Sequence, residues 1–566
     1  MASEALTDRV SGRALMLEAI AAFAVALAFL LALAPTAPFT KELGVCECGA
    51  VRDVLAGNVI LPHYSPGTMV GTPPMYWWMA AVAVRLFGWN EFALRAPALL
   101  ATAIAAAVLY AWLASTLNRR VAMWSVPILL STQYIADAAR QPRQDAVMMM
   151  FLVAALACLE RALADGPRRK RLLTASALAM GGAILTKGPL GIALPGLAVT
   201  VFLATQGRIL RLFSLDVILT FVRAVAIGAI WYLAALSVGG EAFYQFQIVH
   251  WIFRRFLGSA MGAVAECHNP VYYYFPRVIA DFLPWSLFYP ALGIMMWRKK
   301  PNLPASVSFA LCWFAAVLGF FTLSAGKCEV YILSLFPALA AMTAWLVAGV
   351  INREEDAVLT RKAFDWASLA IAAGILAAMI AMVALDAGAM DTLIPHLHRS
   401  DRRYLEILSA AMVGRSPAVI LWMTLWILGA LLVFYAATRK RVFTQSVAIA
   451  AIALSGTVFW YGFMNPALAA QETLRPFAVQ VDRATPPKVA IDYIGPFDCD
   501  VGFYSTREIG SVKSFQCHKP NADAFFIVWQ DRLANFTAEQ RACLDPVAES
   551  APVDSHGART LMIEKK

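Results

Sequence analysis

The chain has 566 residues, of which 60% are hydrophobic and only 15% are charged, and its formal net charge is +10. This composition excludes an ordinary soluble globular protein and is typical of a chain whose surroundings are largely lipid. The positive charge does not indicate nucleic-acid binding, because the basic residues occur in short clusters between apolar segments and form no long basic tract.

Apolar segments recur along most of the chain, and each can cross a hydrocarbon core of about 30 Å at about 1.5 Å per residue. Backbone groups inside a bilayer must be paired within their own segment, so the segments are predicted to be helices. We expect an all-α polytopic membrane protein with about thirteen transmembrane helices. The predicted spans are residues 15–34, 94–115, 121–138, 146–164, 172–186, 189–205, 214–237, 276–297, 305–325, 329–350, 364–386, 416–437 and 443–463.

The basic clusters predict which connections lie in the cytoplasm. The first span is interpreted as an uncleaved anchor, since Arg9 and Arg13 precede it and no small-residue cleavage site follows it. With the N-terminus inside, alternating spans bring every basic cluster to the cytoplasmic face, as the positive-inside rule requires. The loops 36–78, 239–275 and 387–415 are then extracytoplasmic.

The first of these loops carries two candidate catalytic acids, Glu47 and Asp53. It also contains Tyr76, within the aromatic run that leads back to the membrane. The alternative for either acid is an ordinary solvated loop charge.

Three further ionisable residues interrupt or border apolar segments on the same outer face. Asp145 stands directly before a predicted span, where it could also act only as a helix cap. Lys187 is followed by Gly188 and Pro189, a break that would expose backbone amides beside an ammonium group and suits a phosphate. Lys327 occupies a similar place, with Tyr331 one turn later. The alternative for both lysines is snorkelling to the interface.

The second loop contains His250, Arg254, Arg255 and His268. Arginines on the outer side run against the positive-inside bias, so we expect a partner on that side that requires them. The two histidines leave a metal site open, although they form no complete ligand set. No organic cofactor is predicted, and a divalent metal stays open as an alternative.

The chain changes character near residue 471, where its composition becomes that of a soluble protein. We expect residues 1–465 to form the transmembrane domain and residues 466–566 a small extracytoplasmic α/β domain. Helices are predicted near 470–482 and 537–544, and strands at Lys488–Tyr493, Val501–Tyr504, Ala524–Trp529 and Thr560–Glu564. Cys499 and Cys517 are the expected disulfide pair.

These groups together suit transfer of a group from a lipid phosphate at the outer face of the membrane. A carboxylate can deprotonate or orient the acceptor, and Lys or Arg side chains can stabilise the departing phosphate. The residues by themselves do not choose a sugar over another headgroup.

The order of these motifs resembles the bacterial GT-C membrane glycosyltransferases, the protein mannosyltransferase-like group that includes the aminoarabinose transferases of lipid A. The resemblance rests on the acidic first loop and on motifs that follow it in a fixed order. These motifs are Pro73-Pro74-Met75-Tyr76-Trp77-Trp78, Leu94-Arg95, Asp145, Leu185-Thr186-Lys187-Gly188-Pro189, His250, Arg255-Phe256, His268–Tyr274, Pro284-Trp285 and Ser324–Lys327 with Tyr331.

The resemblance implies an inverting transfer of a sugar from an undecaprenyl-type phosphate carrier to an envelope acceptor such as lipid A. It implies Glu47 and Asp145 as catalytic acids, with Asp53 as a rival to Glu47. Donor phosphate contacts would be Lys187, Arg255, Lys327 and Tyr331, and substrate contacts Tyr76, His250, His268 and Arg254.

The protein is expected to be a multi-pass protein of the bacterial inner membrane with its active site facing the periplasm. The chain has Cys46-Glu47-Cys48-Gly49 where relatives commonly have an Asp-Glu pair, and Thr72 where many have Lys. Because these differences fall where substrates would be handled, 4-amino-4-deoxy-L-arabinose and lipid A are not the only candidates. A GT-C transferase acting on protein or another glycan, a flippase of polyprenyl-linked lipids and a non-catalytic envelope scaffold remain alternatives.

Overall fold

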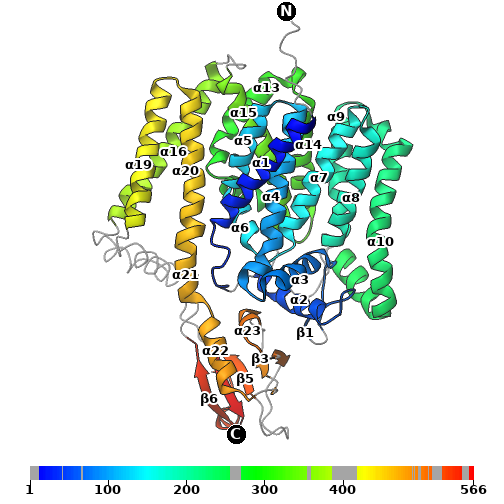
Figure 1. The fold of residues 1–566 in the computed structure, drawn as a ribbon, viewed down its shortest axis with the longest axis vertical. Helices are drawn as coiled ribbons and strands as arrows, with labels where there is room; N and C mark the ends of the chain where they lie inside the picture. The colour runs from blue at the N-terminus through cyan, green and yellow to red at the C-terminus, as the bar shows by residue number, and fades with distance from the viewer. Residues whose placement is uncertain are drawn as a thin grey trace, which may run out of the picture.

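A computed structural model describes residues 12–40, 43–65, 68–254, 269–352, 358–384, 417–486, 489, 491–494, 499–507, 509–512, 525–533, 535–550 and 560–565. It shows a bundle of long helices with a small sheet domain at one end (Figure 1). The first described residues, at the start of α1 (Gly12–Leu31), lie toward the opposite end of the bundle from this domain.

The helices of the bundle follow the apolar segments of the sequence. They are α1 (Gly12–Leu31), α4 (Glu91–Thr116), α5 (Arg119–Leu130), α6 (Gln133–Arg140), α7 (Asp145–Leu163), α8 (Arg169–Lys187), α9 (Leu190–Thr205), α10 (Leu215–Phe243), α12 (Tyr274–Ala280), α13 (Tyr289–Arg298), α14 (Ala305–Leu323), α15 (Phe336–Ile351), α16 (Val358–Ala384), α19 (Pro417–Thr438) and α20 (Val442–Val458).

Every predicted span coincides with at least one of these helices. Within the described residues, nine helices are long and apolar enough to cross a membrane, or ten if the pair joined at a 103° bend, α12 with residues 285–298, is one span. The other three predicted spans differ in length or composition. The segment 121–138 is divided between α5 and α6, α8 begins with three basic residues, and α9 has only 16 residues.

Burial separates central helices from peripheral ones. In α15, every residue from Phe336 to Val350 is buried, as expected for a helix that is apolar on all sides and surrounded by other helices. The outer helices α10 and α19 instead expose large apolar side chains, including Ile230 and Leu421. An exposed apolar surface of this kind suits contact with lipid hydrocarbon.

Two helix starts are set by the residue that precedes them. Asn90 accepts a hydrogen bond from the Ala93 amide at the start of α4, and Asn118 accepts one from the Val121 amide at the start of α5. An asparagine in this position pairs one of the amide groups that have no partner within the helix.

The first loop folds into short elements at the end of the bundle that carries the sheet domain (Figure 1). They are α2 (Glu47–Leu55), a hairpin of β1 (His63–Ser65) and β2 (Thr68–Met69), and α3 (Met75–Phe87). Beyond α10, the chain continues as a π-helix, η3 (Tyr244–Arg254), and α15 is preceded by a 3-10 helix, η7 (Glu329–Leu335). The third loop, 387–415, lies outside the described residues.

The C-terminal part contains α21 (Asn465–Glu472), α22 (Arg475–Ala484), α23 (Cys499–Tyr504), α24 (Gln530–Leu533) and α25 (Ala538–Ala542). Its strands are β3 (Ile491–Ile494), β4 (Ile509–Val512), β5 (Phe525–Trp529), β6 (Leu544–Glu549) and β7 (Thr560–Lys565). They form a sheet in the order β4-β3-β5-β7-β6, in which β3 is parallel to β4 and β5 while β7 is antiparallel to β5 and β6.

Apolar side chains of α22, including Phe477 and Val481, pack with Ile491 and Ile527 of the sheet. The expected α/β character of this part is therefore confirmed. Helical residues run from α20 through residues 459–464 into α21 without a break, so the proposed domain boundary at residue 465 falls within a helical stretch and stays a prediction.

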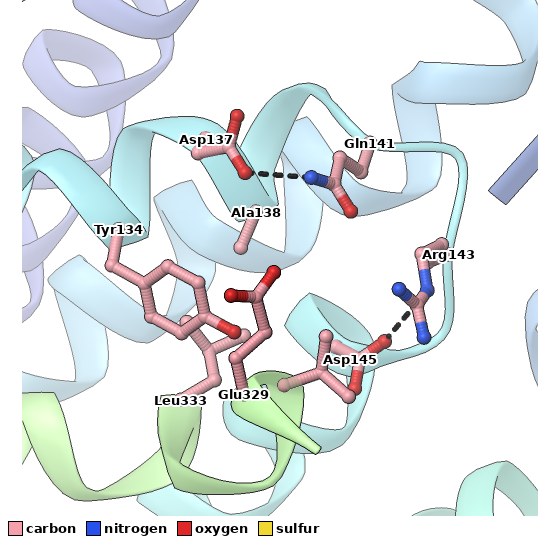
Figure 2. Close-up of a pocket in the computed structure, with 9 residues that line it drawn as sticks. Tyr134, Asp137, Ala138, Gln141, Arg143, Asp145, Glu329 and Leu333 are labelled. Atoms are coloured by element: carbon pink, nitrogen blue, oxygen red, sulfur yellow. Dashed lines mark hydrogen bonds and ion pairs between the residues drawn. The ribbon is translucent and has the colours of Figure 1, made fainter. Parts of the chain in front are cut away.

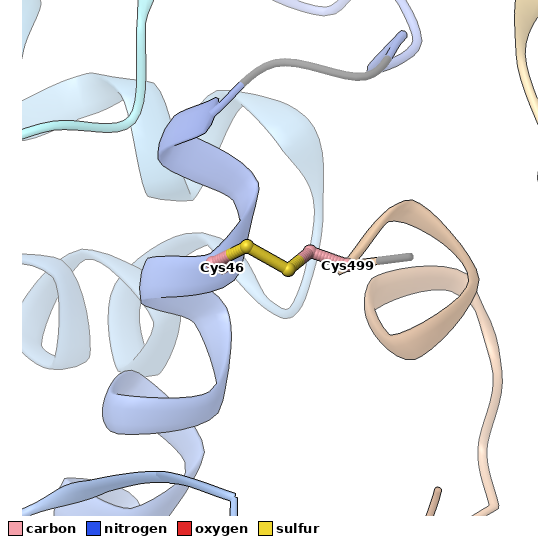
Figure 3. Close-up of a disulfide and its surroundings, with 2 residues drawn as sticks. All are labelled: Cys46 and Cys499. Carbon is pink, nitrogen blue, oxygen red and sulfur yellow. A yellow bond between two sulfur atoms is a disulfide. The ribbon is translucent and has the colours of Figure 1, made fainter. Parts of the chain in front are cut away.

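Two details of the C-terminal prediction are wrong. Residues Val501–Tyr504, expected as a strand, belong to the helix α23. A four-residue apolar run has too little periodicity to separate the two structures. The expected Cys499–Cys517 disulfide is also wrong, because Cys499 is bonded to Cys46, 453 residues earlier (Figure 3). Sequence proximity does not reveal a bond between two distant segments.

Candidate active site

Asp145 and Lys187 form the centre of the candidate site. Asp145 is the first residue of α7 and Lys187 the last of α8, and the two side chains make an ion pair at the same end of neighbouring helices. Their side chains are only 6% and 13% exposed, so the pair is largely removed from water. Burial strengthens the attraction between the charges and also makes either charge costly if it is left alone.

The turn after Lys187 explains how α8 ends there. Gly188 has φ = 66°, a conformation that glycine adopts without strain, and it reverses the chain into α9. The predicted helix break beside this lysine is therefore confirmed. A contact between Lys187 and a phosphate stays a prediction.

A second cation, Arg143, contacts the other oxygen of the Asp145 carboxylate. Its Nε atom is 3.3 Å from Oδ2 of Asp145 (Figure 2). Asp145 is thus held between a lysine and an arginine, which together carry one more positive charge than the carboxylate neutralises. Such a cluster suits an anionic ligand.

Glu47 is the first residue of α2 and is buried. The indole Nε1 of Trp77 donates a hydrogen bond to its Oε2 at 2.5 Å. Burial raises the pKa of the Glu47 carboxyl to about 7, against the opposing effects of the Trp77 hydrogen bond and the Arg143 charge. The negative charge of Asp145 also contributes to the raised pKa, which means that the two acids belong to one electrostatic site.

Asp53, the alternative acid of the first loop, forms hydrogen bonds within the loop itself. Its Oδ2 accepts hydrogen bonds from the His63 amide at 2.8 Å and from the His63 ring at 3.2 Å, and its Oδ1 accepts one from Asn58 at 2.5 Å. These bonds connect the end of α2 to the start of β1. Asp53 thus contributes to the local structure of the loop, whereas Glu47 interacts electrostatically with Arg143 and Asp145.

A pocket opens beside this cluster. Its lining comes from α6, from the segment that leads to α7 and from η7 (Figure 2). The lining residues are Tyr134, Asp137, Ala138, Gln141, Arg143, Asp145, Glu329, Val330 and Leu333. Polar and charged groups from three separate segments thus face one cavity, which is an arrangement expected of a ligand site.

The segment before α15 brings Tyr331 close to this cluster. The Nζ atom of Lys187 is 5.9 Å from the centre of the Tyr331 ring. Lys327, four residues earlier, is buried and donates a hydrogen bond to the Ser324 carbonyl at 2.8 Å. These predicted donor contacts therefore come from η7 and the turn before it, next to the wall of the pocket.

The predicted substrate contacts are distributed differently. Tyr76 is buried in the core and donates a hydrogen bond to the Leu94 carbonyl at 2.8 Å, which favours a structural role. His250 is exposed on η3. Arg254 ends η3, and no side-chain position is described for it. Arg255 and His268 lie outside the described residues.

Sequence reasoning missed four side chains that surround the predicted acids: Arg143, Tyr134, Glu329 and Trp77. Arg143 carried a usable signal, because it is an extracytoplasmic arginine two residues before a predicted acid. The others look like ordinary interface aromatics or loop charges in the sequence. Among the described residues, no group of three or more His, Cys, Asp or Glu side chains is placed to hold a metal ion.

Comparisons with known proteins address the fold and the family. Residues 71–232 match the family described as dolichyl-phosphate-mannose-protein mannosyltransferase. The undecaprenyl phosphate-alpha-4-amino-4-deoxy-L-arabinose arabinosyl transferase of Pectobacterium carotovorum is 29% identical over 61% of this chain and 60% of its own length. The protein of the same description from Pseudomonas paraeruginosa is 30% identical over 51% of this chain and 52% of its own length.

The chain therefore spans only about three fifths or less of the length of these curated relatives. Similarity to solved structures extends further. ArnT from Cupriavidus metallidurans, bound to undecaprenyl phosphate, is similar over 96% of this chain and 97% of its own, with a TM-score of 0.75 and 19% identity. Its apo structure gives a TM-score of 0.76.

The fold predicted from the sequence is thus confirmed, and nine or ten of the described helices are long and apolar enough to cross a membrane. Residues 71–232 are thus similar to the protein mannosyltransferase-like family, and the chain as a whole has the fold of the ArnT structures.

Proposed function

We propose that the protein transfers a sugar from an undecaprenyl phosphate carrier to an envelope acceptor such as lipid A, with inversion, at the periplasmic face of the inner membrane. The leading candidate for the sugar is 4-amino-4-deoxy-L-arabinose. The names of the curated relatives support this choice of donor and sugar, and one structure with the same fold holds undecaprenyl phosphate.

One observation carries the proposal: Glu47, Asp145, Arg143 and Lys187 form a single buried electrostatic site beside a pocket. A carboxyl with a pKa of about 7 is poised to accept a proton near neutral pH. The adjacent cations can stabilise negative charge that develops on a departing phosphate.

In the proposed reaction, an acceptor oxygen attacks the anomeric carbon of the sugar from the side opposite the carrier phosphate. The new carbon–oxygen bond forms as the bond from that carbon to the phosphate oxygen breaks. When the acceptor is a hydroxyl, its proton passes to the Glu47 carboxylate, and when it is an ionised phosphate, Glu47 acts by orienting it. The electron pair of the broken bond leaves with the carrier phosphate.

We assign the carrier phosphate to Lys187, Lys327 and Tyr331, together with Arg255. The Lys187 ammonium is a hydrogen-bond donor, and its Nζ atom lies 5.9 Å from the centre of the Tyr331 ring. Asp145 in this scheme holds the Lys187 ammonium in place. We also propose the division into a transmembrane domain, residues 1–465, and an extracytoplasmic domain, residues 466–566.

The test is a transfer assay with the purified protein in liposomes. Undecaprenyl phosphate-linked aminoarabinose serves as donor and lipid A as acceptor, and mass spectrometry detects the product. We expect lipid A to gain the mass of one sugar residue, and Glu47→Gln to reduce the rate by about 100-fold, within the range attributed to a general base. Glu241→Gln is the matched control, since Glu241 is an exposed glutamate near the end of α10.

Loss of activity in both variants, or in neither, would contradict the role of Glu47. A flippase predicts a different result altogether, namely movement of the donor lipid between leaflets without any new covalent product. Donor hydrolysed or transferred to another added glycan, with lipid A unchanged, would move the proposal to a different acceptor.

A further inference from the structure

The C-terminal domain contacts the loop that carries Glu47. Cys46 immediately precedes Glu47 and is bonded to Cys499, the first residue of α23 (Figure 3). Their Cα atoms are 4.9 Å apart, although 453 residues separate them in the sequence. The C-terminal domain is therefore covalently attached one residue away from the proposed catalytic acid.

A second contact joins the other end of α23 to the same helix of the loop. Arg52, in the last turn of α2, donates hydrogen bonds from Nη2 to the carbonyls of Phe503 at 3.2 Å and Ser505 at 2.9 Å. The carbonyls at the end of a helix have no partner within it, so a guanidinium group at this position pairs them and complements the helix dipole.

Trp89 reinforces this second contact from the segment between α3 and α4. Its Nε1 donates a hydrogen bond to the Phe503 carbonyl at 3.1 Å, and its ring stacks on the Phe503 ring at a centroid distance of 5.3 Å. The Arg52 guanidinium lies 4.7 Å from the centre of the Trp89 ring. Arg52 and Trp89 thus both donate to the Phe503 carbonyl and also contact each other.

A third contact is made by Tyr504, the last residue of α23. Its hydroxyl accepts a hydrogen bond from the Phe39 amide at 2.7 Å and donates one to Oε1 of Glu91 at 3.0 Å. Phe39 lies near the start of the first loop, and Glu91 is the first residue of α4. Tyr504 therefore connects the entrance of the loop to the helix that follows it.

These contacts matter because α2 has only nine residues. Helices of this length are marginal in water and depend on tertiary contacts for their position. Trp77 holds the Glu47 carboxyl from within the bundle, whereas the start of α2 is joined to α23. A small displacement of a catalytic group can lower a rate by about 100-fold.

We propose that α23 of the C-terminal domain is a positioning element of the active site. It holds α2, and with it Glu47, through the Cys46–Cys499 disulfide and Arg52, while Tyr504 fixes α23 to Phe39 and Glu91 on either side of α2. The proposal rests on the proposed function, because it assigns a purpose to the position of Glu47. The C-terminal domain then supports the active site. Its separation from the loop would inactivate the enzyme without removing any side chain from the pocket.

The neighbouring thiol does not compete for this disulfide under ordinary conditions. Cys48 is buried, and burial raises the pKa of its thiol to about 12. Disulfide exchange requires the thiolate, which is scarce at neutral pH when the thiol pKa is this high. The attachment of Cys46 to Cys499 is therefore protected against rearrangement by the nearest cysteine.

The test compares three variants of the full chain. Cys46→Ser/Cys499→Ser removes the covalent link, and Tyr504→Phe removes both hydrogen bonds while keeping the ring. Arg507→Ala is the control: Arg507 donates only within the C-terminal domain among its described contacts, to the carbonyls of Asp482 at 3.0 Å and Thr485 at 2.9 Å. It perturbs the same domain without touching the loop contacts described above.

We expect the first two variants to lower kcat by about 10- to 100-fold and to leave the KM for the donor close to that of the parent. Their kcat/KM should also reach half of its maximum at a lower pH, because a displaced Glu47 becomes better hydrated and its pKa falls from about 7 towards 4.5. If these contacts only stabilised the fold, their loss would change neither kcat nor the pH dependence of kcat/KM at temperatures where the protein remains folded.

Hydrogen exchange supplies a measurement that does not need activity. The amides of α2 should exchange faster in the first two variants than in the parent, and no faster in Arg507→Ala. Unchanged exchange in α2, or an equal loss of kcat in Arg507→Ala, would overturn the inference. A parent protein without transferase activity would instead contradict the proposed function, while the exchange measurement would still decide the positioning role.

Discussion

At the scale of single residues, Glu47 has the environment of an acid whose proton affinity is raised. It is buried, and its pKa of about 7 places the change between the two protonation states within the accessible pH range. The neutral form dominates below that pH and cannot accept a proton, so a general base at this position loses activity as the pH falls.

We therefore expect kcat/KM of the parent to fall by about tenfold for each pH unit below 7. The residual activity of Glu47→Gln should lack this dependence, because the amide does not titrate in the range. The measurement is a pH profile between about 5.5 and 8.5 in liposomes. A parent profile that stays flat below pH 7 would remove the proton-accepting role from Glu47.

Lys187 differs from Glu47 because it is already paired in the absence of substrate. Lys187→Met should weaken donor use and also destabilise the fold by on the order of 2 kcal/mol, since it leaves the buried Asp145 with Arg143 as its remaining cation. The double variant Asp145→Asn/Lys187→Met should recover stability but not activity.

Thermal unfolding and donor kinetics of the single and double variants separate the two effects. Recovery of activity together with stability in the double variant would mean that Lys187 contributes only by neutralising Asp145. A single variant that retains the parent's donor kinetics would count against a phosphate contact.

At the scale of elements, Arg95 shows how the bundle supports the first loop. It is completely buried in α4 and donates hydrogen bonds from Nη1 to the carbonyls of Pro35 at 3.1 Å and Ala37 at 2.5 Å. Its guanidinium also lies 4.4 Å from the centre of the Phe39 ring. A single side chain thus fixes the point at which the chain leaves α1.

Arg95→Ala should destabilise the protein by on the order of 3 kcal/mol, because two buried carbonyls lose a charged donor and a cavity remains. Arg85→Ala is the matched control, since Arg85 is an exposed arginine of α3. Thermal unfolding in detergent is the measurement. Equal melting temperatures for the two variants would show that the burial of Arg95 contributes nothing to stability.

At the scale of the whole molecule, the elements of the first loop and the C-terminal domain lie at the end of the bundle opposite the start of α1 (Figure 1). The basic connections of the sequence predict that this end faces the periplasm. A connection at the other end carries the ion pairs of Asp165, including one with Arg169 at 2.6 Å. The charge pattern therefore supplies a test of the orientation.

Single cysteines at the exposed positions Glu241 and Lys170 should differ in labelling. In intact cells with a permeable outer membrane, an impermeant maleimide should label Glu241→Cys, and should label Lys170→Cys only after lysis. The parent protein, whose free cysteines at positions 48, 158 and 312 are buried or half-buried, supplies the background. The opposite labelling pattern would reverse the proposed face of the active site.

Much of the fold follows from local sequence properties. The apolar length of each span and the basic connections act over a few residues, and each predicted span overlaps a helix of the bundle. Asp145 and Lys187 could also be predicted, because an ionisable residue at the end of an apolar segment stands out against its surroundings.

Local signals failed where a long-range contact decides the outcome. Arg143, Tyr134 and Glu329 reach one pocket only because α6, α7 and η7 meet at one end of the bundle. The choice of Glu47 over Asp53 depends on which carboxylate Trp77 and His63 contact, and neither partner is a sequence neighbour. The same holds for the helix at Cys499–Tyr504, whose contacts with the first loop span more than 400 residues.

By itself, the sequence determined a polytopic membrane protein and predicted its orientation and the face that carries the polar motifs, since hydrophobic length and charge distribution act locally. Only the tertiary structure decided that Glu47 shares a buried site with Asp145 and Lys187, and that Cys499 is bonded beside it. Burial and pairing between distant segments depend on how the helices pack, which no single segment specifies.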